Sequence, residues 1–274
     1  MTRIRTYKDF SRNDPELRTF DFWYRANHDL ILGARTVHKF GRAIVGTSFV
    51  PIGWTTGTGG IYRTPTTATA LEFVSTNDAD TAAGAGARKL KVEGLDANWE
   101  LCEQEVETNG TTPVPLTIDL TRIFRMYDVE SGTYATATTG SHVGDLIVRE
   151  SGGGQEWARV DSTDFPRGQS EIAAYTVPKG EVAFVEGTLA NIDSSRIGTI
   201  IFFQRPNADS VTAPFLGAMR EVFQFGGLAG PVHLSTKNAI GPFVGPCDIG
   251  YMAKVSQLTG EIDADFEITL FTFE

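Results

Sequence analysis

Cysteine and histidine are scarce in this chain of 274 residues. It has two cysteines, Cys102 and Cys247, and four histidines, and none of them stands at His-x-x-x-His or Cys-x-x-Cys spacing. Such spacing is the usual sign of a zinc site, and a larger set of closely spaced cysteines is the usual sign of a disulfide framework. We therefore expect no resident metal ion, and we expect both cysteines to be free, partly buried thiols.

The sequence also lacks any apolar run approaching the roughly 20 residues that a membrane helix requires. Its first 20 residues contain no apolar core of the kind found in signal peptides. Positive charge is in deficit, since the net charge is -10, whereas nucleic-acid binding needs a concentrated positive face. These features predict a soluble protein made in a cytosol, with neither nucleic acid nor a membrane as its partner.

The charge is unevenly distributed along the chain. Residues 1–42 contain nine Lys/Arg and five acids, a net of +4, which leaves -14 on the rest. Residues 20–25 (FDFWYR) are too aromatic to sit in water. This basic, aromatic segment docks either on its own domain or on a neighbouring copy, and a solvated mixed-charge segment is the plainer alternative. The interface candidates are four charged guides and four apolar anchors: Arg3, Arg5, Arg12, Arg18, Phe20, Phe22, Trp23 and Tyr24.

The rest of the chain is a succession of short alternating runs separated by turn residues. Residues 69–74 and 88–94 alternate apolar with polar side chains, and residues 262–273 place five apolar side chains on one face, Ile262, Ala264, Phe266, Ile268 and Leu270. We count about a dozen such runs, among them one at 60–63 and one at 215–225, and no helix pattern. The sequence therefore predicts an all-β fold, an antiparallel β-sandwich with jelly-roll-like topology.

The expected organisation is an N-terminal arm with the first strand over residues 1–45, followed by a β-sandwich domain over residues 46–274. The polar stretch at residues 130–141 is where that domain would divide if it has two parts.

Candidate sites for chemistry have simpler explanations. A calcium loop offers more oxygen ligands in close order than the two Asp-Ala-Asp triplets at 78–80 and 263–265. The glycine-rich residues 151–154 lack the lysine and the helix of a phosphate-binding loop. No Ser/His/Asp or Cys/His arrangement is legible, so we assign no catalytic, metal-binding or cofactor-binding residue and predict a protein that is not an enzyme.

Sugar binding is the alternative to a purely structural role. Paired carboxylates serve glycoside hydrolysis, but a repeated set on one strand face, Glu103, Glu105 and Glu107, is typical of a solvated surface. Trp99 and Trp157 have the ring size to stack on sugars, although a tryptophan in a β-sandwich usually belongs to the core.

Several turn-dominated motifs resemble those of virion structural proteins of tailed bacteriophages, especially phages from aquatic environments. The resemblance covers most of residues 68–273. It rests on residues 75–88 (STNDADTAAGAGAR), 92–99 (VEGLDANW), 109–112 (NGTT), 168–170 (GQS), 175–180 (YTVPKG), 203–205 (FQR) and 241–243 (GPF).

This resemblance implies a particle component whose function is to form an interface. The expectation is a capsid decoration (cement) protein, a homo-oligomer and most plausibly a trimer, which is synthesised in the bacterial host cytoplasm and binds the phage major capsid protein on the capsid exterior. The alternatives are a tail, adaptor or neck-associated structural protein, and a carbohydrate-binding or glycosidase sandwich of a tail spike. No cofactor is implied.

Overall fold

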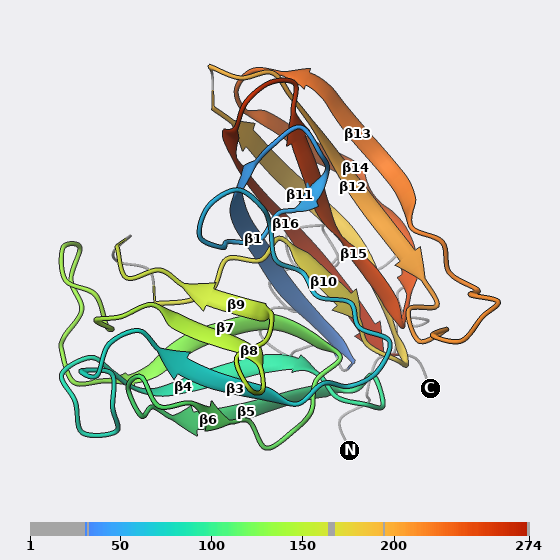
Figure 1. Cartoon of the computed structure of the whole chain (residues 1–274). Coiled ribbons are helices and arrows are strands. Elements are labelled where there is room, and N and C mark those ends of the chain that lie inside the picture. Colours follow the sequence, from blue (N-terminus) through green and yellow to red (C-terminus); the bar gives the residue numbers. More distant parts are fainter. Residues whose placement is uncertain (1–30, 32, 164–167, 194, 273–274) are drawn as a thin grey trace.

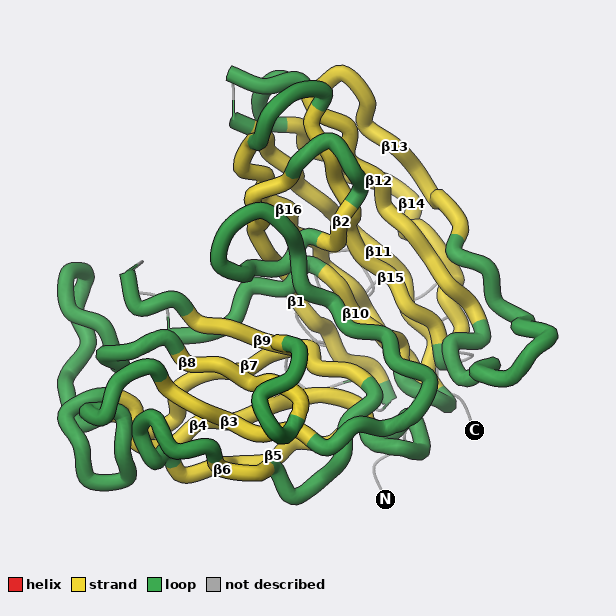
Figure 2. Tube along the Cα trace, in the orientation of Figure 1, coloured by secondary structure: helices red, strands yellow, loops and turns green. Residues whose placement is uncertain are grey.

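The computed structural model describes residues 31, 33–163, 168–193 and 195–272 of the chain. These residues form sixteen β-strands and no helix (Figures 1 and 2). None of them forms a helix that could cross a membrane. The all-β, antiparallel class expected from the alternating sequence is therefore confirmed for the described residues.

Four separate antiparallel sheets make up the fold. The first has the order β1 (Ala34–Val45), β16 (Gly260–Thr272), β11 (Glu181–Ile192) and β14 (Val232–Val244). The second has the order β10 (Ala174–Val177), β15 (Cys247–Val255), β12 (Gly198–Pro206) and β13 (Arg220–Leu228), with β2 (Val50–Pro51) also paired to β15. Together these two sheets are the large pair, which stands at the upper right in Figure 1.

The other two sheets lie below and to the left of the large pair in Figure 1 and form the small pair. The third sheet has the order β6 (Val114–Pro115), β3 (Leu71–Ser75), β8 (Leu146–Glu150) and β9 (Glu156–Val160). The fourth has the order β5 (Leu101–Glu107), β4 (Ala87–Leu95) and β7 (Arg122–Ser131). All strands of the small pair therefore lie between β1 and β10 in the sequence.

Each pair of sheets packs around its own core because apolar residues alternate along the strands. In β16 the five apolar residues of the predicted face are all buried in the core of the large pair. In β4, Leu90 and Val92 are buried in the core of the small pair, while Lys89 and Lys91 on the opposite face contact acids of β5.

The second sheet contributes to both cores. Along β10, Tyr175 belongs to the first core and Ala174 to the second, and along β12 Phe202 belongs to the first and Phe203 to the second. Successive side chains of a strand point to opposite faces, so the second sheet is covered on both faces where β10 and β12 supply these residues.

Several finer expectations need correction. The molecule has four sheets in a blade-like arrangement rather than clearly one jelly-roll sandwich over residues 46–274. The polar stretch at 130–141 runs from the end of β7 toward β8 inside the small pair, and the chain passes between the pairs before β3 and after β9. Residues 60–63 form no strand, the strand expected at 215–225 begins at Arg220, and β14 was not anticipated. The loop that contains residues 60–63 has isolated β-bridges at Gly53 and Thr58 in place of a strand.

Candidate functional site

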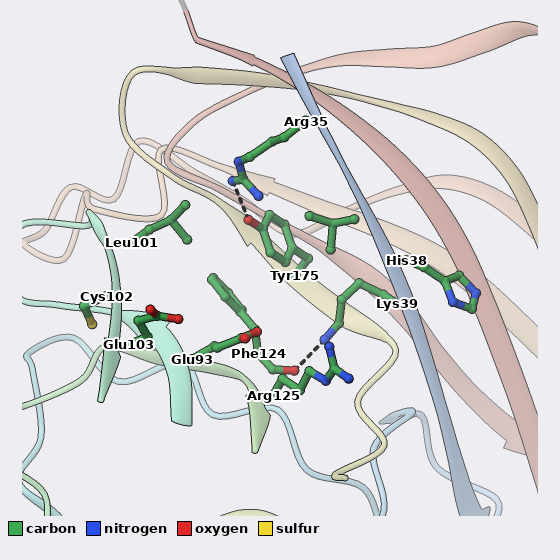
Figure 3. Close-up of a pocket in the computed structure, with 11 residues that line it drawn as sticks. Arg35, His38, Lys39, Glu93, Leu101, Cys102, Glu103, Phe124, Arg125 and Tyr175 are labelled. Carbon is green, nitrogen blue, oxygen red and sulfur yellow. Dashed lines mark hydrogen bonds between the residues drawn. The ribbon is translucent and has the colours of Figure 1, made fainter. Parts of the chain in front are cut away.

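A cavity of about 380 Å3 lies where the first half of β1 faces the fourth sheet (Figure 3). It combines apolar walls with converging charges, the usual character of a binding site. Strands of both pairs line it, through these residues: Arg35, Val37, His38 and Lys39 from β1, Glu93 from β4, Leu101, Cys102 and Glu103 from β5, Phe124 and Arg125 from β7, and Tyr175 from β10.

The alternation of β1 selects which of its side chains enter the cavity. Arg35, Val37 and Lys39 are odd-numbered positions of the strand and share one face. His38 is exposed at the opposite side of β1 in Figure 3, where its ring lies 3.8 Å from Asp265. In a strand with only apolar residues on this face, the odd-numbered positions would pack into a core. In β1 the same face carries two cationic side chains.

Arg35 is fixed at one end of the cavity. Its guanidinium donates hydrogen bonds to the Tyr175 hydroxyl at 2.8 Å and to Glu181 at 2.6 Å. Burial opposes the charge of Arg35, but Tyr175 and Glu181 outweigh burial and raise its pKa. The Tyr175 ring in turn stacks at 4.3 Å on Phe124, so the apolar wall and the charged end are one packed unit.

Lys39 is the unusual residue of the cavity. Its side chain is 6% exposed, and its ammonium donates a hydrogen bond to the Phe124 carbonyl. Burial, with help from the positive charge of Arg125, lowers the pKa of Lys39 to about 7, against the opposing effect of Glu93. Within the described part of the chain, neither Lys39 nor Arg125 forms an ion pair with a carboxylate.

The β5 side of the cavity is acidic and partly apolar. Glu103 pairs with Lys91 at 3.2 Å on the outer surface, and Leu101 at the rim is 47% exposed. Burial and the nearby Asp96 raise the pKa of the Cys102 thiol to about 11, so Cys102 is mostly protonated at neutral pH. The arrangement can hold a carboxylate between Lys39 and Arg125 while apolar groups pack against Phe124 and Leu101.

A buried charge network fixes β7 beside this cavity. Arg122 and Asp248 are both fully buried and form a two-pronged ion pair at 2.9 and 3.1 Å. Arg205 and the Thr176 hydroxyl also donate to Asp248. Burial would raise the pKa of Asp248, but the adjacent arginines outweigh burial and lower it. Because β7 belongs to the small pair and β15 to the large pair, this network joins the two.

Ser141, His142 and Asp128 come together although the sequence showed no such grouping. The Ser141 hydroxyl donates directly to Asp128, and His142 lies 3.5 Å from the same carboxylate through Nδ1. The Nε2 atom of this buried histidine lies 3.1 Å from the Asp161 carbonyl. In a catalytic triad Nε2 would face the serine hydroxyl, so this geometry is that of a structural cluster.

The structure places the other residues considered from sequence as follows. The eight interface candidates between Arg3 and Tyr24 lie outside the described residues. Trp157 and Trp99 are buried, which removes them from any sugar-stacking surface. Glu103 and Glu105 are exposed and face lysines of β4, as expected of a solvated strand face. Both cysteines are free, as predicted.

Both acids of the first Asp-Ala-Asp triplet, at residues 78–80, accept hydrogen bonds within the fold. Buried Asp80 accepts hydrogen bonds from Ser75 and from the backbone of Ala87, Val143 and Gly144. Asp78 accepts two from Thr111. In the part of the chain that the structure describes, no group of three or more potential metal-ligating side chains occurs.

Sequence reasoning missed the cavity because its lining comes from five strands spread over 140 residues. The one local signal was the pattern of β1, in which Arg35 and Lys39 share a face with Val37.

Comparison with known proteins gives no assignment. No family model matches the chain, and no curated protein matches it. Among solved structures, the structure of infectious bursal disease virus Gx strain has a TM-score of 0.23 at 10% identity, covering 86% of this chain and 71% of that chain. The structure of the Gt strain of the same virus also has a TM-score of 0.23, at 9% identity, covering 87% of this chain and 70% of that chain. Similarities at this level carry no argument about fold or function.

Proposed function

We propose that this protein is a non-enzymatic structural component of a virus particle, namely a capsid decoration protein that binds the shell of a tailed bacteriophage from outside. Its partners would be further copies of itself, most plausibly in a trimer, and the major capsid protein. The motif resemblance described above motivates the phage assignment, and the strand order of the large pair is the observation that carries the structural role.

Apart from the two-residue β2, the large pair has eight strands, which in chain order are β1 and β10 to β16 and are numbered here 1 to 8. In that numbering the first sheet reads 1-8-3-6 and the second reads 2-7-4-5. We infer that the large pair by itself has jelly-roll topology, because this interleaved order is what two Greek keys wound over two sheets produce. Viral capsid proteins are prominent among the proteins that use such double sheets, although a fold alone does not define a function.

The small pair supports an interface role because it is an insertion. Strands β3 to β9 all lie between the first and second strands of the large pair. An insertion of this size displays a second folded surface without interrupting the eight-strand order. The connection between β12 and β13 adds exposed apolar side chains, with Phe215 at 63%, Leu216 at 71% and Met219 at 50% exposure. Exposed apolar groups gathered in one loop favour a contact surface.

The sugar-binding alternative is the weaker one. It relied on Trp99 and Trp157, which are both buried. A tail, adaptor or neck-associated position uses the same kind of interface protein, so the location in the particle distinguishes it from the decoration role.

The test is the position of this protein in a density map of the assembled particle. Density for the two sheet pairs on the outer face of the icosahedral shell supports the proposal. Density confined to the tail vertex would replace the decoration role by the tail or neck role. Absence from purified particles, or release of reducing sugar from host-envelope polysaccharide by the purified protein, would overturn the structural assignment.

A further inference from the structure

We propose that the cavity beside β1 is the receptor for residues 20–25 (FDFWYR) of a neighbouring copy of this chain. This contact rests on the proposed function, because it requires a protein that assembles with copies of itself. The two surfaces that meet are the cavity of one copy and residues 20–25 of the next.

The first argument is an unbalanced charge. Lys39 and Arg125 lie side by side on the cavity wall, and their mutual repulsion contributes to the lowered pKa of Lys39, which the nearby Glu93 carboxylate only partly offsets. Neither has a carboxylate partner within ion-pair distance among the described residues. A carboxylate placed between them would relieve the repulsion and form charge-assisted hydrogen bonds in a poorly solvated site.

The second argument is the chemistry of the occupant. The 30 residues before the first described one contain five acids, and Asp21 alone has an aromatic residue on each side, Phe20 and Phe22. The cavity presents the matching set, with Lys39 and Arg125 beside the Phe124 ring and the half-exposed Leu101. Farther along, Arg25 of the segment would meet the acidic side of the cavity at Glu103.

The third argument is the course of the chain, which favours a neighbouring copy over the same molecule. The described chain enters at Ile31, which is buried, and the Gly33 carbonyl accepts a hydrogen bond from the Thr272 amide at 2.7 Å. From there β1 runs past Arg35 toward Lys39 along the cavity. Docking in the same molecule would require the chain to reverse within about ten residues, which span at most about 35 Å, whereas a neighbouring copy requires no reversal.

Leu101→Cys provides a test in the full-length protein, because Leu101 is half-exposed at the cavity rim, whereas Cys102 packs against the second core and is replaced by Cys102→Ser. In this background a second cysteine is introduced on either side of the segment, as Thr19→Cys or Ala26→Cys, and the proteins are oxidised with diamide at mildly alkaline pH over a range of concentrations. We expect at least one of them to form a disulfide-linked dimer. The dimer should be lost when Leu101 is left unchanged, and Thr6→Cys should give none.

The role of Asp21 is tested in the variant that cross-links best. Asp21→Lys should lower the dimer yield at least tenfold, whereas Asp14→Lys, the same change of charge outside the segment, should leave it within about twofold. Far-UV circular dichroism checks that each variant remains folded.

A monomeric disulfide-linked product would overturn the neighbouring-copy assignment. Absence of any cross-link through the Leu101→Cys position at every concentration, or equal yields for the two charge variants, would overturn the docking site. These results can be distinguished from a failure of the proposed function, because a protein seen on the shell but never cross-linked through this position would keep its structural role and lose only this contact.

Discussion

At the scale of single residues, the most consequential side chain is Asp248. It lies in β15 with no exposed surface and is the only acid that pairs, among the described residues, with Arg122 and Arg205. Buried pairs contribute little relative to apolar packing, but breaking one leaves an uncompensated charge in the interior. The network therefore makes the junction of the two sheet pairs sensitive to a single substitution.

We expect Asp248→Asn to lower the free energy of unfolding by about 3–5 kcal/mol, because Arg122 stays buried without its counter-charge. Urea denaturation followed by circular dichroism measures the change. Glu130→Gln is the matched control, since it removes an acid from a solvent-exposed pair with Arg88 at 3.9 Å, and exposed pairs contribute less than about 1 kcal/mol. Similar losses in the two variants would contradict the role of burial.

Lys39 gives a pH dependence of defined sign. Its pKa is lowered to about 7 in the folded protein, while the unfolded chain holds the proton up to the ordinary lysine value near 10.4. Between these values the unfolded state binds more protons, so stability rises with pH. Below about pH 7 both states are protonated and the cost of burying the charge is fully present.

The measurement compares the wild-type protein with Lys39→Met, because other groups that titrate in this range then cancel. The unfolding free energy of the wild type relative to Lys39→Met should rise from pH 7 to pH 10 by a few kcal/mol, since each pKa unit corresponds to about 1.4 kcal/mol. A difference that stays constant, or that falls with pH, would show that Lys39 remains charged inside the cavity.

At the scale of elements, the pairing of β4 with β7 depends on a close backbone approach. Gly94 is opposite Ile123 where the register shifts, and a Cβ at Gly94 would overlap the Arg122 carbonyl oxygen. Backbone atoms of a central strand pair cannot move as a flexible side chain can. Only glycine therefore fits at position 94 of the fourth sheet without a backbone shift. Gly94 lies next to Arg122 and close to the cavity wall at Phe124.

We expect Gly94→Ala to destabilise the protein by about 1–3 kcal/mol, the usual effect of overpacking. Gly187→Ala in β11 is the matched control, because Gly187 also lies at a register shift but has open space where its Cβ would be. That variant should stay within about 0.5 kcal/mol of the wild type. Thermal melts of the three proteins decide the matter, and a Gly94→Ala protein as stable as the Gly187→Ala protein would be the contrary result.

At the scale of the whole molecule, the second sheet is the structural centre. Its strands β10 and β12 supply alternate side chains to the two cores, and β15 carries Asp248 at the junction. Neither sheet pair can lose its core without exposing one face of this shared sheet. The two pairs are thus parts of one cooperative unit.

This predicts a single unfolding transition. Trp99 belongs to the first core and Trp157 to the second, so Trp99→Phe and Trp157→Phe variants weight tryptophan fluorescence toward different cores. In each variant the fluorescence melt should coincide with the far-UV circular dichroism melt, the standard test of two-state unfolding. Two separated transitions would show that the pairs unfold independently.

The sequence by itself determined the class of the fold and the faces of its regular strands. Period-two alternation identified the buried side of β16 and of β4, because a strand with one core-facing side shows it directly in its residues. It also identified the cysteines as unpaired. These are local properties, set by each residue and its near neighbours along the chain.

Only the tertiary structure decided the number of sheets, the order of their strands and the cavity. Pairing of β1 with β16 joins residues more than 200 positions apart, and no local pattern encodes such a partner. For the same reason, Lys39 and Arg125 are unrelated in sequence, and their adjacency arises from the way β1 faces the fourth sheet. A buried ion pair such as Arg122 and Asp248 looks like two ordinary surface charges until the fold removes both from water.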